Sequence, residues 1–254
     1  MQSAVTSCLV CWVAAQLCTA PVHAQSSLGI AGLDLRGFLS DAEGEAGAGL
    51  AGRIDVAVTA AHGFQGDFAY VDEGDGAIGR IAAHLYMAPE EAHKYGLFAF
   101  AGDVDGRSMF YGGVGAEGLI ALGPRTVAEG RVGAGLADQN GLDYIFADAG
   151  VTHRLGPSMT VGLNAAFTDF DEVDFDALST EVTARAEWSP RGRAMGLYAE
   201  IVTDDLSGPD GAAAETTLRA GLTLTLGRVA PGRPHSTLFA TPDPVAPLVR
   251  RGLY

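Results

Sequence analysis

The chain has 254 residues, of which 48% are hydrophobic, and its 31 acidic and 16 basic residues give a net charge of −15. The acidic balance argues against nucleic acid as a partner, because phosphates attract basic proteins. The hydrophobic content argues against a disordered chain, and no apolar run of about 18 residues, as a membrane-spanning helix needs, follows the N-terminal segment.

The first element is a segment typical of an export signal. A largely apolar run over residues 4–20 is followed by Pro21-Val22-His23-Ala24, which resembles the A-x-A cleavage pattern. We therefore expect residues 1–24 to be a cleaved signal peptide. All three cysteines lie in this segment, so the mature chain would hold neither a disulfide nor a thiolate metal site.

The remaining chain repeats one pattern, in which apolar and polar side chains alternate over about ten residues. Side chains on a strand point to opposite faces with a period of two, so each repeat predicts a strand with one apolar face. Twelve segments are expected to be strands: 28–36, 50–60, 64–71, 77–87, 95–102, 108–120, 126–136, 143–153, 158–168, 178–188, 194–202 and 216–226. Ten residues at ~3.3 Å each and a tilt of ~40° climb ~25 Å, the height of a barrel's apolar band.

The connections between these segments form two classes that alternate along the chain. One class carries 18 acidic residues and a single base, and comprises residues 37–49, 72–76, 103–107, 137–142, 169–177 and 203–215. The other is mostly shorter, carries 2 acidic and 5 basic residues, and comprises residues 61–63, 88–94, 121–125, 154–157 and 189–193. Successive turns of an up-and-down meander lie at opposite ends. We therefore expect acidic loops at one end, and both chain termini at the other.

At the level of pattern, residues 25–227 resemble the porin-like outer-membrane β-barrels of Gram-negative bacteria. The expected fold is all-β, an up-and-down antiparallel transmembrane β-barrel of about 12 strands, with 10 strands as the alternative count. The resemblance implies location in the cell outer membrane, with membrane lipid, lipopolysaccharide and the barrel-assembly machinery as partners. It gives no oligomeric state. Such barrels commonly end on Phe or Trp, whereas this last strand ends at Leu226-Gly227.

Residues 228–254 follow the last expected strand and differ from it in composition. They contain five prolines, which lack the N–H that a sheet ladder needs. We therefore expect a Pro-rich, mobile, mildly basic tail on the periplasmic side.

The charged face of the strands is expected to line the barrel's interior, because an Arg or Lys facing lipid at the midplane costs ~2–4 kcal/mol. The expected lumen-lining residues are Arg53, Asp55, Arg80, His84, Glu117, Glu129, Arg131, Glu181, Arg185, Glu187, Glu200 and Arg219. An acidic excess among them would weakly favour cations. The alternative is a barrel plugged by its own ion pairs, since twelve strands need not leave an open channel.

Two further patterns bear on ligands. The densest acidic cluster, Asp169, Asp171, Glu172, Asp174 and Asp176, offers oxygen ligands for loosely bound Ca²⁺ or Mg²⁺, and a solvated acidic face is the alternative. The G-x-G-x-x-G sequence at residues 113–118 lies inside an expected strand, where its glycines favour close approach of neighbouring strands or of an inward side chain rather than a dinucleotide site.

No catalytic residue is predicted, because the sequence has neither a G-x-S-x-G motif nor histidines at metal-ligand spacing. The leading hypothesis is a non-enzymatic integral outer-membrane protein, acting as a small passive diffusion pore or as a structural membrane component. The alternatives are an outer-membrane lipid-modifying enzyme and a secreted soluble β-barrel that binds a ligand.

Overall fold

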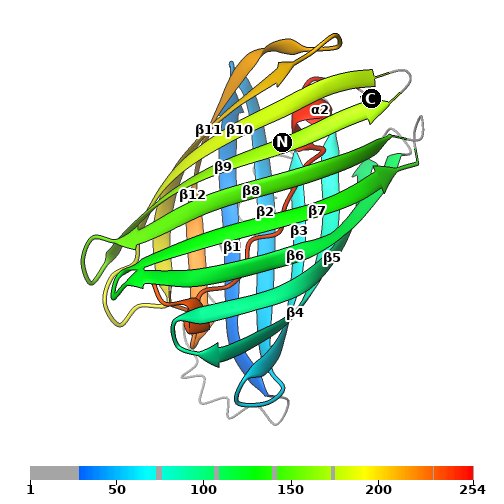
Figure 1. Cartoon of the computed structure of the whole chain (residues 1–254). Coiled ribbons are helices and arrows are strands. Elements are labelled where there is room, and N and C mark those ends of the chain that lie inside the picture. The colour runs from blue at the N-terminus through cyan, green and yellow to red at the C-terminus, as the bar shows by residue number, and fades with distance from the viewer. Residues whose placement is uncertain are drawn as a thin grey trace.

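The computed structural model describes residues 29–72, 76–105, 109–138, 142–172, 175–230 and 232–253, so the expected signal peptide lies outside the described residues. Twelve antiparallel strands close into one barrel (Figure 1). They are β1 (Ile30–Ala42), β2 (Glu45–Ala57), β3 (His62–Asp72), β4 (Ala77–Glu90), β5 (His93–Asp105), β6 (Met109–Gly123), β7 (Thr126–Ala137), β8 (Asp143–Arg154), β9 (Met159–Glu172), β10 (Phe175–Trp188), β11 (Met195–Ser207) and β12 (Ala212–Gly227). The predicted all-β, up-and-down fold of twelve strands is confirmed.

Each strand pairs with its neighbours in the chain, and β12 closes the barrel by pairing with β1 from Gly32 opposite Gly227 to Ala42 opposite Thr217. Closure leaves no strand edge unpaired. We call the end where β1 begins and β12 finishes the proximal end. The opposite end, formed by the β1–β2, β3–β4, β5–β6, β7–β8, β9–β10 and β11–β12 connections, is the distal end.

The strands continue well into the segments expected to be acidic distal loops. Residues 37–49 form the ends of β1 and β2, joined by a two-residue turn in which Glu43 and Gly44 have φ of 50° and 96°. Positive φ at both central residues is the geometry of a tight hairpin turn. Most of residues 169–177 and 203–215 is likewise strand, so the expectation of long loops there was wrong. Main-chain pairing persists where the apolar alternation that marks a strand in the sequence has ended.

The outer face of the barrel is apolar on every strand. Each of the twelve strands exposes at least one large apolar side chain, as Leu39, Leu97 and Val114 do at 71%, 66% and 63%. Soluble monomers rarely expose contiguous apolar patches larger than a few hundred Å². An apolar surface that encircles the barrel suits contact with lipid.

The C-terminal segment, described at residues 228–230 and 232–253, runs inside the barrel from the proximal to the distal end (Figure 1). It contains two short helices, η1 (Pro234–Ser236) and α2 (Ala246–Arg250). Phe239 and Leu248 within it are 1% and 0% exposed. This differs from the mobile periplasmic tail that the sequence predicts. The prolines do keep the segment out of the sheet, but their carbonyl groups still accept hydrogen bonds from the wall.

An aromatic patch on the inner wall packs against this segment. It consists of side chains from β5, β6, β8 and β9: Phe98, Phe100, Tyr111, Tyr144, Phe146 and Phe170. The ring centroids of Phe100 and Phe146 lie 5.9 Å apart, and Val245 and Leu248 of the C-terminal segment join the same buried cluster. The patch explains why residues 95–102 are apolar on both faces, with Leu97 outside and Phe98 inside.

Glycines on β6 make room for these rings, as the sequence predicts for residues 113–118. A Cβ atom at Gly113 would lie 2.8 Å from the Phe100 ring, and one at Gly115 would lie 2.6 Å from the Phe98 ring. Real Cβ atoms essentially never approach other heavy atoms below 3.0 Å.

No helix among the described residues is long and apolar enough to cross a membrane.

Candidate functional site: the barrel interior

The candidate site is the interior wall together with the C-terminal segment. All twelve residues expected to line the lumen lie on strands of the wall, and each of their side chains is buried or half-buried. Their contacts divide into a charged wall on β1, β2 and β10–β12, a second polar wall on β2–β8, and bonds to the C-terminal segment.

The charged wall is a chain of ion pairs. Arg185 contacts Glu187 at 3.1 Å and Glu200 at 3.5 Å, and Glu200 contacts Arg219 at 3.3 Å. The β11–β12 register places Glu200 and Arg219, both expected to line the lumen, directly opposite each other. The Arg185 guanidinium also lies 3.9 Å from the centroid of the Tyr198 ring, a cation–π contact. The wall is therefore held in place by charges from three neighbouring strands.

Two members of this wall are absent from the predicted set. Asp34 of β1 accepts hydrogen bonds from Arg53 at 2.5 Å and from Thr225 at 3.0 Å, and it pairs with Arg36 at 2.8 Å. These contacts tie β1 to both of its neighbours across the closing seam. The alternation of Asp34 and Arg36 with the apolar Leu33 and Leu35 is the signal in the sequence that marks them as inward-facing.

The opposite wall carries a buried histidine between two carboxylates. His84 Nδ1 lies 2.8 Å from Glu117, and its Nε2 lies 3.3 Å from Asp67. Arg131 donates to both oxygens of Asp148 at 2.6–3.0 Å, in the two-pronged geometry that makes arginine–carboxylate pairs strong. All five side chains are at most 9% exposed. Each charge in this region is therefore paired inside the wall.

Two more predicted residues complete this side. Asp55 accepts a hydrogen bond from the Tyr86 hydroxyl at 2.6 Å. Glu129 lies 3.6 Å from Arg131 and faces the space between the walls. Lys94, which was not among the predicted residues, stacks its ammonium group over the Tyr86 ring at 4.0 Å.

Side chains of the wall donate hydrogen bonds to the main-chain carbonyl groups of the C-terminal segment. Lys94 donates to the Thr237 carbonyl at 3.0 Å, Gln65 to Phe239 at 2.9 Å and Arg131 to Ala240 at 2.7 Å. Arg53 also donates to Phe239 at 3.3 Å, and Arg80 donates to Pro242 at 3.1 Å. Three of the arginines expected to line the lumen, at positions 53, 80 and 131, therefore contact this segment.

At the distal end the segment is fixed by ion pairs. Arg250 of α2 contacts Glu181 at 2.9 Å and Asp204 at 3.1 Å, and Arg251 contacts the same Asp204 carboxylate. Arg251 also donates to the main-chain carbonyl of Ala213 at 3.2 Å. Asp204 is fully buried, so both arginines neutralise a carboxylate that water does not reach.

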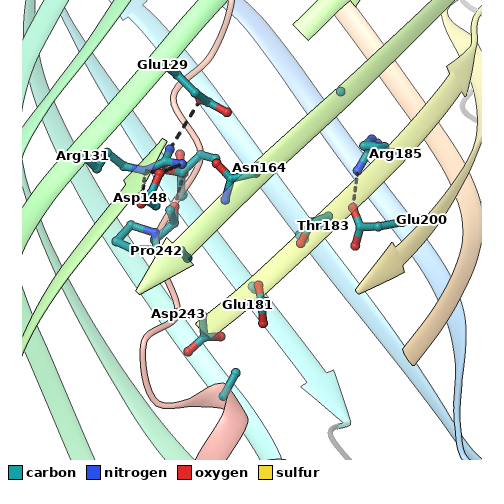
Figure 2. A pocket seen from close by; sticks show the side chains of 18 of the residues that line it. Glu129, Arg131, Asp148, Asn164, Glu181, Thr183, Arg185, Glu200, Pro242 and Asp243 are labelled. Carbon is teal, nitrogen blue, oxygen red and sulfur yellow. Dashed lines mark hydrogen bonds and ion pairs between the residues drawn. The ribbon is translucent and has the colours of Figure 1, made fainter. Parts of the chain in front are cut away.

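A cavity of about 450 Å³ remains beside the segment. Figure 2 shows Arg131 and Glu129 on one side of this space, Arg185 and Glu200 on the other, and Pro242 of the C-terminal segment along it. The volume lies within the range of ligand pockets, ~300–1,000 Å³. Charged and polar side chains line it together with apolar ones, so it can hold water and small polar molecules.

The acidic cluster proposed for divalent cations lies at the β9–β10 hairpin. Asp169, Asp171 and Asp176 are exposed, and the register places Asp171 opposite Asp176. Asp174 lies outside the described residues. Among those that are described, no group of three or more acidic, His or Cys side chains could hold a metal ion. The cation site therefore stays a prediction.

Comparison with known proteins places the fold in one class. No family model and no curated protein matches the sequence. Among solved structures, the NanC porin has a TM-score of 0.58 at 10% identity and covers 76% of this chain and 100% of its own. The KdgM porin has a TM-score of 0.51 at 9% identity, covering 76% and 98%, and an outer-membrane channel from Pseudomonas putida F1 has 0.52 at 11%, covering 82% and 99%. The chain therefore has the fold of porin-like outer-membrane barrels, as its pattern predicts.

Proposed function

We propose that the protein is an integral outer-membrane barrel that acts as a narrow passive channel for small polar solutes. One observation carries the proposal. The twelve-strand closed barrel is apolar outside on every strand and charged inside. In lipid, a closed barrel pairs all its main-chain groups internally, which is one of the two ways a chain can span a bilayer.

The apolar outer face favours a barrel inserted in a membrane rather than a soluble barrel. In water, an apolar belt of side chains such as Leu39, Ile81 and Leu85, which are 65–71% exposed, would be in contact with solvent all round the barrel. Turning the arginine-bearing face outward instead would cost ~2–4 kcal/mol for each arginine at the midplane. The folded barrel therefore has its lowest free energy in a membrane.

The interior supports a path for small polar solutes. The cavity of about 450 Å³ is far larger than the ~10–15 Å³ that one water molecule needs, so it has room for many. Both signs of charge line it in nearly equal number, because Arg36 and Arg250 add to the predicted arginines to give seven arginines against eight carboxylates. We therefore propose a weak charge preference rather than strong selection of cations.

Passage through lipid vesicles tests the channel. The protein is refolded into vesicles of outer-membrane lipid, and swelling is followed in isosmotic solutions of sugars of increasing size. We expect small sugars to enter and oligosaccharides to be excluded, with protein-free vesicles as the control. Inserted barrels that admit no solute would favour a second function, a structural membrane component. The C-terminal segment inside the barrel is the observation that supports that second function.

A further inference from the structure

The C-terminal segment spans the interior as a continuous, bonded element. Near the proximal end, the Lys94 side chain of the wall donates a hydrogen bond to the Thr237 carbonyl of the segment. At the distal end, the Arg251 side chain of the segment donates one to the Ala213 carbonyl of the wall. A barrel of about 8 strands is filled by its own side chains, whereas 16–18 strands leave an aqueous channel. Twelve strands lie between these limits, and the segment occupies the additional space.

The composition of the segment fits this position. Pro242, Pro244 and Pro247 have no N–H group, so they bring no main-chain donor that the interior would have to satisfy. The segment presents carbonyl groups instead, and those of Thr237, Ala240 and Pro242 accept hydrogen bonds from Lys94, Arg131 and Arg80 of the wall. A proline-rich strip and a cationic wall are complementary in hydrogen bonding.

The segment is not built into the sheet. Within the described part of the chain, the main-chain hydrogen bond from Arg228 to Ala31, at 2.8 Å, is the one such bond between this segment and a strand. That bond lies at the segment's start. Every other described polar contact with the wall uses a wall or segment side chain. The segment can therefore leave the interior without breaking the ladder that holds the barrel together.

The distal end of the segment is where most of its contacts converge. Val245, Leu248 and Val249 are fully buried in the cluster that contains Met109 and Tyr111. The Arg250 and Arg251 pairs with Asp204 lie beside this cluster. Helix α2 thus fills the distal mouth with apolar side chains and fixes itself there with two buried charges.

We propose that residues 228–253 are an autoinhibitory plug, and that the Arg250 and Arg251 pairs with Asp204 are the latch that keeps it seated. Seated, the plug leaves a cavity of about 450 Å³ beside it. Released from the distal end, it opens the full interior of the twelve-strand barrel. The proposal rests on the channel function above and adds the element that limits it.

Ion conductance across planar bilayers tests the plug. The full chain is compared with a chain that ends at Gly227, and insertion of each is verified by its heat-sensitive mobility in gels. We expect several-fold higher conductance without the segment, and a synthetic peptide of residues 228–254 added from the proximal side should lower it again. Equal conductance of the two inserted barrels would overturn the plug. A shortened barrel that inserts but conducts nothing would instead contradict the channel function.

The latch is tested in the full-length chain. This second experiment also tests the plug if the shortened chain fails to fold. The double change Arg250→Glu and Arg251→Glu places two carboxylates against Asp204, so the plug should be expelled and conductance should rise toward the shortened barrel's level. The matched control is Arg233→Glu, a charge reversal at an exposed residue of the same segment. Parental conductance in the double variant, or an equal rise in the control, would overturn the latch.

Discussion

At the scale of single residues, the barrel separates two environments across a wall one strand thick. Val182 is 43% exposed on the outer face, while its neighbour Thr183 is half-buried and faces the inner cavity. Neighbouring residues on a strand point to opposite faces, so one position in the sequence decides between lipid and a polar interior.

This separation predicts that Val182→Arg damages membrane assembly far more than Thr183→Arg. The first change puts a guanidinium against lipid, at ~2–4 kcal/mol near the midplane. The second puts it beside carboxylates in the cavity. Folding yield into lipid vesicles measures both variants. Equal losses would mean that the faces are assigned wrongly or that the barrel is not in a membrane.

The Arg131–Asp148 pair predicts a second residue-scale effect. Arg131→Met leaves Asp148 buried without its partner, which should cost about 3–5 kcal/mol. The double variant Arg131→Met/Asp148→Leu removes both charges and should recover much of that loss. Urea unfolding in detergent micelles measures the two variants against the parent. A double variant no more stable than the single one would contradict this account of the pair.

At the scale of elements, β6 shows how the strand sequence serves the interior. Gly115 faces inward beneath Phe98, whereas Gly123 near the end of the same strand has no heavy atom within 4 Å of an added Cβ. Gly115→Ala should therefore destabilise the barrel by about 1–3 kcal/mol through overpacking. Gly123→Ala should stay within about 0.5 kcal/mol of the parent. The same unfolding measurement compares them, and a neutral Gly115→Ala would mean that both the Phe98 ring and the Val132 main-chain carbonyl, the nearest atoms to an added Cβ, give way readily.

Alternation made the twelve strands and most of their inward residues predictable, because each strand has an apolar outer face and a polar inner face. The distal strand ends at Glu43-Gly44 and around 169–177 were not predictable, since there the main chain keeps pairing after the alternation has ended. The prolines of the C-terminal segment exclude a strand, and the sequence therefore predicts a mobile periplasmic tail. What the prolines do not exclude is an extended chain whose carbonyls bind Arg53, Arg80 and Arg131.

At the scale of the whole molecule, the barrel is a single up-and-down array in which successive connections lie at opposite ends. The β10–β11 connection, which contains Gly192, is proximal, and the β11–β12 connection, which contains Gly208, is distal. Each strand of an outer-membrane barrel crosses the membrane once, so proximal and distal connections face opposite compartments, and we expect the end where β1 begins and β12 finishes to be periplasmic. The two glycines should therefore lie on different sides of the membrane.

Surface labelling of epitope tags on intact cells tests this most directly. A tag inserted after Gly208 should be labelled on whole cells, and a tag inserted after Gly192 should be labelled only when the outer membrane has been opened. The reverse pattern would invert the barrel in the membrane. Labelling of neither tag on whole cells, with the protein found free in the periplasm or the medium, would contradict the membrane barrel itself.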